Sequence, residues 1–298
     1  MAADTTLKKY HIPVLVNEVI EAMDLKDNGV YLDVTFGGGG HSRALLDANK
    51  TIKVYGLDWD ENALNQAESF PDEYQGRLMT VWGSFAHLYK IIKKYKLPKF
   101  DGILADFGTS QNQIFERHGF SVHRDTPLDM RMSVAHFKTT AADIINQASE
   151  EELRQLFWTL GEERSARKIV FAISEARKKK KICTTGELAS LIEKTVGRSG
   201  KIHPATRVFQ ALRISVNQEL ENITAFLPVA QEALKSNGRL VCISFHSLED
   251  RLVKHYFQEQ VKIGTGEVPF KRAIIAGDEE LAENPASRSA KLRALQKK

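Results

Sequence analysis

Apolar runs and helical periods alternate along the first third of the chain. Runs rich in β-branched and aromatic residues predict buried strands. They are residues 30–36, 53–57, 78–82 and 100–105. Between them, apolar residues recur every three or four positions, which predicts helices. Strands that alternate with helices indicate an α/β fold built on a parallel sheet.

The alternation stops between residues 111 and 202, where no run predicts a buried strand. Three helical patterns fill this region instead. They lie at about residues 149–160, 165–181 and 184–196. We therefore expect two domains: an α/β domain formed by residues 1–110 and 203–298 together, and a helical domain of residues 111–202 inserted into it.

The α/β pattern returns after the insertion. A long helical pattern covers residues 204–234, and a fifth buried strand is predicted at residues 239–244. Two weaker strand patterns follow in the tail, at residues 270–275 and 290–294. They predict an antiparallel hairpin that closes the sheet.

Four consecutive glycines, residues 37–40, follow the first predicted strand, and Asp58 follows the second. Glycines let the backbone approach a ligand closely. A carboxylate after the second strand can accept both ribose hydroxyls of a nucleoside. The glycine spacing fits neither the dinucleotide fingerprint nor a P-loop. An acid in the first strand (Asp33), then glycines, then Asp58 is the pattern of S-adenosylmethionine sites. The alternative is a flexible turn in an ordinary α/β protein.

Two further candidates follow later strands. The carboxyl ends of parallel strands share one edge of the sheet, where ligands bind. Phe85 follows the third strand, where its ring either flanks an adenine or packs in the core. Asp106 follows the fourth strand, and we expect it at the same crevice as Gly39, Gly40 and Asp58.

Composition narrows the class of protein. The 298 residues are 42% hydrophobic and 27% charged, as in globular proteins. There is no apolar run of transmembrane length, residues 1–9 lack a signal-peptide apolar segment, and the cysteine usage suits a reducing compartment, so we expect a cytoplasmic protein. Cys183 and Cys242 form neither a metal-binding spacing nor a disulfide framework, so no metal is predicted. A net charge of +4 and the basic run 177–181 permit a polyanionic partner, although a solvated helix end explains the run equally well.

Seven stretches together have the sequence and order of one known family. They are residues 11–15, 35–42, 101–106, 127–132, 202–207, 244–251 and 283–285 with 289–293. The chain resembles, over nearly its whole length, the RsmH/MraW family of bacterial small-subunit ribosomal RNA cytosine-N4 methyltransferases. This resemblance implies a class I S-adenosylmethionine-dependent methyltransferase (Rossmann-like) domain, interrupted by a helical substrate-recognition domain. The implied reaction is methylation of N4 of a specific cytidine in small-subunit (16S) ribosomal RNA, with the small ribosomal subunit as partner.

The resemblance also implies functional residues. Those assigned to S-adenosylmethionine are Gly39, Gly40, His41, Asp58, Phe85, Asp106 and Gln113. Asp106 is also the predicted catalytic residue, as an acceptor close to the reacting amine; a backbone carbonyl of residues 107–110 is the alternative acceptor. Arg207, His246 and Ser247 are either substrate-side or structural. One departure concerns Gln111 and Asn112, which replace the Ser-Pro pair that the family usually has.

Two alternatives to this function stay open at the level of sequence. The first is an S-adenosylmethionine-dependent methyltransferase that acts on DNA or protein. The second is a non-catalytic ribosome-assembly factor that retains the fold. Retention of five residues argues against the second, because a scaffold has little reason to keep them together: Gly39, Gly40, Asp58, Asp106 and Gln113. The sequence leaves open the oligomeric state and which cytosine is chosen.

Overall fold

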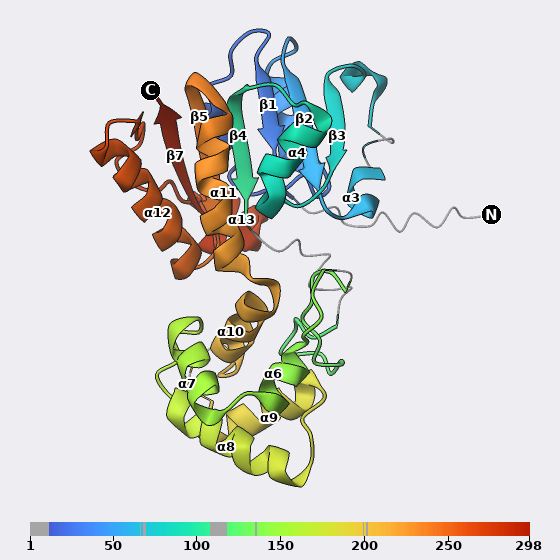
Figure 1. Ribbon diagram of the computed structural model, residues 1–298, viewed down its shortest axis with the longest axis vertical. Coiled ribbons are helices and arrows are strands. Elements are labelled where there is room, and N and C mark those ends of the chain that lie inside the picture. The colour runs from blue at the N-terminus through green and yellow to red at the C-terminus, as the bar shows by residue number, and fades with distance from the viewer. Residues whose placement is uncertain are drawn as a thin grey trace, which may run out of the picture. The chain divides into compact units, whose positions relative to one another are not determined.

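Two compact units make up the chain. The computed structural model describes residues 12–65, 67, 70–107, 118–134, 136–198, 200 and 202–298. One unit combines Met1–Gly108 with Leu220–Lys298, and we call it the sheet unit. The other is Thr109–Glu219, which we call the helical unit. Figure 1 shows the elements of both and labels many of them.

The sheet unit is built on a mixed sheet with the strand order β3-β2-β1-β4-β5-β7-β6 in the described part of the chain. Neighbouring strands from β3 to β5 pair in parallel, whereas β7 is antiparallel to both β5 and β6. The strands are β1 (Val30–Asp33), β2 (Lys53–Asp58), β3 (Leu78–Trp82), β4 (Phe100–Asp106), β5 (Leu234–Ser244), β6 (Gly266–Glu267) and β7 (Lys291–Lys297). The five strands predicted for the parallel sheet are confirmed.

Helices cover both faces of this sheet. The helices of the unit are α1 (Val16–Met23), α2 (Gly40–Ala48), α3 (Glu61–Asn65), α4 (Leu88–Tyr95), α11 (Glu219–Ala233), α12 (Ser247–Lys262) and α13 (Asp278–Glu283). Successive strand residues point to opposite faces. Leu32 packs with α4, α11 and α12, and Tyr31 packs with α1 and α2. In Figure 1, α4 and α11 lie in front of the strands.

The tail differs in part from its prediction. The run at residues 290–294 forms most of β7, as expected. The run at residues 270–275 is not a strand: Ile274 makes only an isolated bridge to Leu292, and the two-residue β6 takes the outer position beside β7. Pairing at a sheet edge depends on the partner strand more than on local pattern, which is why the weak signal misled. None of the helices in the described residues is long and apolar enough to cross a membrane.

The helical unit has its own apolar core. Its helices are α6 (Ala141–Gln147), α7 (Glu150–Thr159), α8 (Ala166–Lys179), α9 (Thr185–Val196) and α10 (Thr206–Asn217). Capping boxes at Thr140, Ser149 and Thr184 satisfy the first N–H groups of α6, α7 and α9 and fix where these helices begin. The three helices predicted for the insertion are confirmed as α7, α8 and α9.

The second boundary between the units lies later than the predicted residue 203. The expected single helix at residues 204–234 is divided in two by Gln218, whose φ of 51° is left-handed. Before the break, Val208 and Leu212 pack in the core of the helical unit. After it, Phe226 packs in the core of the sheet unit. The apolar period runs on through the break, so the pattern alone hides it.

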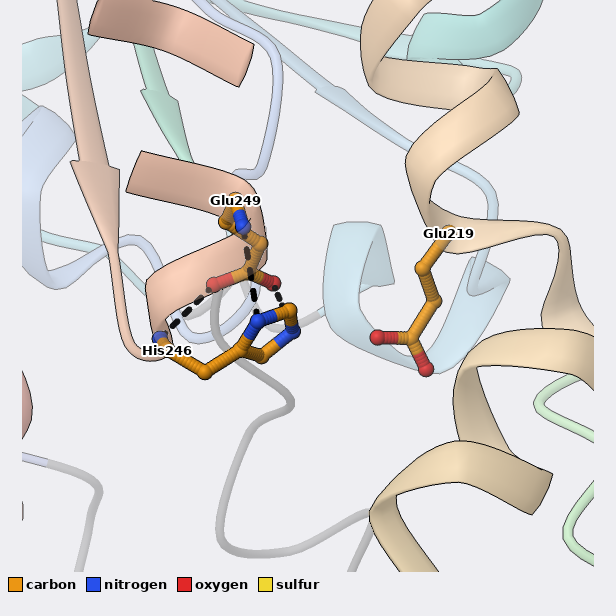
Figure 2. Close-up of side chains that lie close together, drawn as sticks. All are labelled: Glu219, His246 and Glu249. Carbon is orange, nitrogen blue, oxygen red and sulfur yellow. Dashed lines mark hydrogen bonds and ion pairs between the residues drawn. The ribbon is translucent and has the colours of Figure 1, made fainter. Parts of the chain in front are cut away.

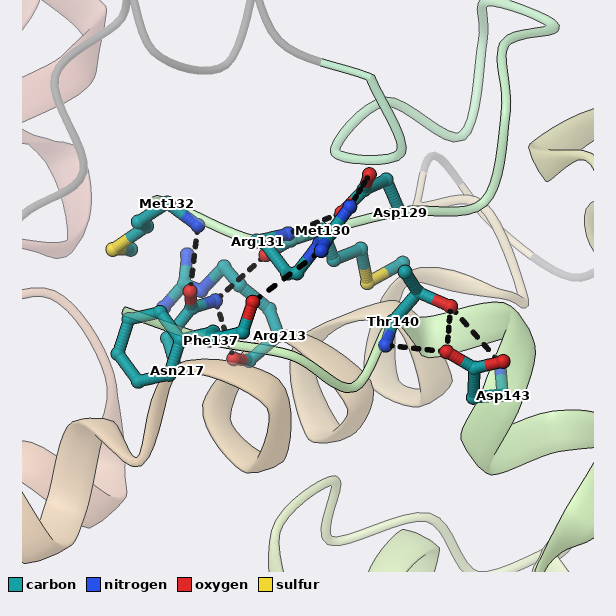
Figure 3. A network of polar contacts seen from close by, with 9 residues as sticks. All are labelled: Asp129, Met130, Arg131, Met132, Phe137, Thr140, Asp143, Arg213 and Asn217. Carbon is teal, nitrogen blue, oxygen red and sulfur yellow. Dashed lines mark hydrogen bonds and ion pairs between the residues drawn. The ribbon is translucent and has the colours of Figure 1, made fainter. Parts of the chain in front are cut away.

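The stretch at residues 127–132 is bound to α10 by Asn217 (Figure 3). This side chain is 2% exposed. Its Oδ1 accepts from the N–H of Met132 at 2.7 Å, and its Nδ2 donates to the carbonyl of Met130 at 2.8 Å. Beside it, the Arg131 guanidinium donates to both oxygens of Asp129, at 2.7 and 2.8 Å, and holds the pKa of that carboxyl below its usual range.

We expect Asn217→Ala to lower the free energy of unfolding of the helical unit by about 1–3 kcal/mol, because it leaves backbone groups of Met130 and Met132 without their partner. Urea unfolding followed by far-UV circular dichroism would measure the loss. Gln155→Ala, which truncates an exposed amide on α7, is the control and should change stability by less than about 0.5 kcal/mol. An equal effect of both substitutions would contradict this role of Asn217.

Candidate active site

The end of β1 is tied to its neighbours by polar side chains. Asp33 is 1% exposed; its carboxylate accepts from Ser42 Oγ at 2.8 Å and from the Thr35 N–H at 3.2 Å. Burial raises the pKa of Asp33. The Thr35 hydroxyl accepts from the N–H of Asp106 at 2.7 Å. These bonds connect the turn after β1 to the end of β4. Asp33 is thus part of the scaffold, and Thr35, which sequence reasoning missed, positions Asp106.

The glycine turn is required by packing. Gly39 has a φ of +71°, and a Cβ there would lie 2.5 Å from the ring of Phe70 and 2.7 Å from that of Phe36. A Cβ at Gly40 would lie 2.9 Å from Pro13. Helix α2 therefore begins close against the preceding chain, and no side chain caps its first N–H groups. Such a helix start favours an anionic group, such as the carboxylate of a methionyl moiety.

His41 lies in the first turn of α2 and is only 7% exposed. Its Nε2 is 2.8 Å from the carbonyl oxygen of Val14, and its Nδ1 is 3.9 Å from Oδ2 of Asp106. The ring thus joins the segment before α1 to the end of β4. A positioning role follows from these contacts, and the predicted contact with the cofactor stays a prediction.

Asp58 ends β2 with both carboxylate oxygens engaged. Oδ2 accepts from the N–H of Gly37 at 2.8 Å, and Oδ1 accepts from the N–H of Asp60 at 2.9 Å. The side chain is 8% exposed, and burial raises the pKa of its carboxyl to about 6. An ionised carboxylate offers about four acceptor positions. Two of them remain for ribose hydroxyls, which suits the predicted role.

Phe85 opens the short 3₁₀ turn η3 (Phe85–His87) after β3. Its half-buried ring lies 5.8 Å from that of Phe107 and 5.5 Å from that of Phe226, measured between centroids. Both interpretations of this residue were open, and the contact with Phe226 places the ring against the core of the sheet unit. Its contact with an adenine stays a prediction.

His246 caps α12 at the end of β5 (Figure 2). Its Nδ1 accepts from the N–H of Glu249 at 3.4 Å. In return, the Glu249 carboxylate accepts from the N–H groups of Phe245 and His246, at 2.8 and 3.2 Å. This geometry supports the structural interpretation of His246. A substrate role for it, and for Ser247 in the same turn, stays a prediction.

Two predicted residues remain, Arg207 and Gln113. Arg207 belongs to the helical unit, where its Nη1 donates to the carbonyl of Glu162 at 3.4 Å. Its predicted association with His246 and Ser247 therefore stays a prediction. Gln113, together with the divergent pair Gln111 and Asn112, lies outside the described residues.

The groups at the carboxyl edge fit S-adenosylmethionine. Asp58 supplies acceptors for the ribose, and the uncapped start of α2 supplies N–H groups for a carboxylate. Asp106, whose side chain is 13% exposed, ends β4, which pairs with β1. A parallel sheet closed by an antiparallel strand, with these groups at its edge, defines a class I S-adenosylmethionine-dependent methyltransferase.

Comparison with known proteins agrees with this class. Residues 8–298 match the sequence model of the MraW methylase family. A protein of Sulfurihydrogenibium sp. named "Ribosomal RNA small subunit methyltransferase H" is 46% identical over 286 residues, covering 95% of this chain and 97% of its own. A protein of the same name from Gloeothece citriformis is 46% identical over 303 residues, covering 100% and 97%. The chain belongs to the MraW methylase family.

One solved structure is a distant match. TrmN from Thermus thermophilus superposes with a TM-score of 0.44 at 12% identity, over 95% of this chain and 48% of that one. A likeness at this level carries no argument about function.

Proposed function

We propose that this protein transfers the methyl group of S-adenosylmethionine to the exocyclic N4 of a cytidine in small-subunit ribosomal RNA. The observation that carries the proposal is the carboxyl edge with Gly39, Asp58 and Asp106, in a chain 41–46% identical to proteins named for small-subunit ribosomal RNA methylation. Localisation with the ribosome, in the cytoplasm, follows from this substrate.

The reaction needs positioning more than activation. S-adenosylmethionine supplies a methyl group on a sulfonium, which is already a strong electrophile. The cytosine amine is a weak nucleophile, because its lone pair is delocalised into the ring. The protein must therefore hold nitrogen, methyl and sulfur in line. Asp106 accepts an N–H of the amine, favours a less conjugated nitrogen and stabilises the positive charge that develops. Its backbone is fixed for this by Thr35.

Two rival functions explain fewer of these observations than methylation of ribosomal RNA does. A methyltransferase of DNA or protein uses the same cofactor edge, but the names of the relatives favour RNA. A non-catalytic assembly factor has no use for a buried carboxylate such as Asp58, whose desolvation disfavours its charged form.

Methyl transfer from labelled S-adenosylmethionine tests the proposal directly. The acceptors are small ribosomal subunits that lack this modification, naked small-subunit RNA and duplex DNA, followed by nucleoside analysis. Label in N4-methylcytidine from RNA is the expected result. Label in DNA or protein would discard the proposed target, and cofactor binding without transfer would favour the assembly factor.

The helical unit is the substrate-recognition part of this proposal. Arg164, Arg167, Lys168 and Phe171 are exposed and follow one another at helical spacing along the outer side of α8 and its N-terminal approach. The ring of Phe171 is 64% exposed. None of the three cations has a hydrogen bond or ion pair within the described residues, in contrast to Lys178, which pairs with Glu175 at 2.5 Å. Unpaired cations suit phosphates, and an exposed ring suits a stacked base.

Replacing Arg164, Arg167 and Lys168 together by alanine should raise KM for RNA at least about tenfold and lower the slope of log affinity against log salt by about 2–3, since three phosphate contacts are lost. The Kd for S-adenosylmethionine should stay unchanged. Lys178→Ala, on the same helix but ion-paired, is the matched control. An unchanged salt slope in the triple variant would remove α8 from the RNA-binding surface.

A further inference from the structure

A cavity of about 440 Å³ lies in the sheet unit, beyond the end of β5. Sites for small ligands are commonly about 300–1,000 Å³. Two of the stretches that carry the family resemblance meet here, residues 244–251 and residues 283–285 with 289–293. Its lining includes Phe245, Ser247, Ile275, Leu281, Arg288 and Lys291.

The cavity adjoins the proposed catalytic edge. Asp106 pairs with Ile243 in the sheet, and the N–H of Phe107 donates to the carbonyl of Ile243 at 3.0 Å. Ser244, the next residue, pairs with Lys291 on the opposite side of β5. Adjacent strands are about 4.8 Å apart. The cavity therefore begins one strand away from Asp106, at the same edge of the sheet.

The walls of the cavity are apolar and its charged groups are positive. Phe245, Ile275 and Leu281 provide flat or aliphatic surface. The Arg288 side chain is exposed and makes no hydrogen bond or ion pair with any described residue. Lys291 approaches Asp250 only at 3.7 Å, because that carboxylate is bound by Arg293 at 2.6 and 3.1 Å. The lining residues include no carboxylate.

An apolar slot with one cation, Arg288, that is unpaired among the described residues, and a second, Lys291, in a long ion pair with Asp250 fits a group that is flat at one end and anionic at the other. A single nucleotide turned out of an RNA strand has this form, and a base must be turned out to be methylated. We infer that this cavity receives the target pyrimidine nucleotide of the RNA, with its base between Phe245, Ile275 and Leu281 and its phosphate at Arg288 and Lys291. The inference rests on the proposed function and names the part of the site that holds its substrate.

The test uses cytidine 5′-monophosphate as the probe on the full-length protein, with cytidine for comparison. Calorimetry or NMR titration of the unmodified protein should show tighter binding of the monophosphate than of cytidine. Arg288→Ala with Lys291→Ala should abolish that difference and raise KM for RNA at least tenfold, with kcat changed less than threefold. Ile275→Glu, at a position that is 64% exposed, introduces a negative charge near the bound phosphate. It should weaken binding of the monophosphate about as much as the double variant does.

Lys262→Ala is the matched control. It removes an exposed cation at the far end of α12, about 22 Å along the helix from Ser247. Unchanged monophosphate affinity and unchanged KM in the double variant would overturn the inference, and methyl transfer that continues normally would leave the proposed function standing. Absence of methyl transfer to any RNA by the unmodified protein would instead defeat the proposed function, while the monophosphate titration still decides whether the cavity binds a nucleotide.

Discussion

Asp58→Ala is expected to weaken S-adenosylmethionine binding at least about 100-fold, because two hydrogen bonds from ribose hydroxyls to a carboxylate are lost, each worth about 1.5–3 kcal/mol. The position of Asp58 is specific: its oxygens also accept from Gly37 and Asp60, so the carboxylate is held by the glycine turn and by the residue that follows β2. Calorimetry at pH 7.5 measures the change. Asp72→Ala, which removes an exposed acid in the same unit, should leave the Kd unchanged. A Kd within threefold of the original for Asp58→Ala would refute the assignment.

The pH dependence of the same residue gives a second measurement. Burial raises the pKa of Asp58 from 3.8 to about 6. Protonation removes acceptor capacity, so cofactor affinity should decrease as the pH falls through 6 and level off above it. Folding responds in the opposite direction: the folded chain holds this proton more tightly than the unfolded chain, so the contribution of Asp58 to stability decreases as the pH rises from 3.8 to 6. Asp58→Ala should flatten both profiles.

The local pattern of apolar residues was sufficient to predict an element wherever that element is itself a continuous apolar segment. The strands of the parallel sheet are continuous apolar runs, and the carboxyl ends of such strands share an edge, so the sequence alone predicts Asp58 and Asp106 at one edge. The glycine turn could also be predicted, although the structure adds a second reason for its glycines. Besides allowing a ligand to approach the backbone, Gly39 and Gly40 are needed because Phe70 and Pro13 leave no room for a Cβ.

Long-range contacts explain what the sequence could not show. The helix break at Gln218 cannot be predicted from the sequence pattern, because the apolar residues on both sides of it keep the same helical period. Those residues nevertheless pack in different cores. The hydrogen bond between Thr35 and Asp106 joins residues 71 positions apart, and no spacing rule predicts it. Arg288 and Lys291 come beside Phe245 only because β7 pairs with β5. Of the two, only Lys291 lies in a stretch that carries the family resemblance, and no local pattern marks Arg288.

Asp106→Ala should reduce kcat by about 10²–10³-fold. This is the usual loss when a positioned group that stabilises charge developing in the transition state is removed. The N–H of Asp106 stays bonded to Thr35 in the variant, because that contact uses the backbone, so the fold of the edge should survive. Single-turnover methyl transfer under saturating RNA and cofactor separates this loss from weaker binding.

Asp106→Asn distinguishes charge from shape, because the amide keeps an acceptor oxygen but carries no negative charge. If the carboxylate stabilises the positive charge on the reacting nitrogen, the asparagine variant should be nearly as slow as the alanine variant. If it only orients the amine, asparagine should restore most of the rate. Near-normal methyl transfer by Asp106→Ala would remove Asp106 from the mechanism and favour the alternative acceptor, a backbone carbonyl such as that of Phe107.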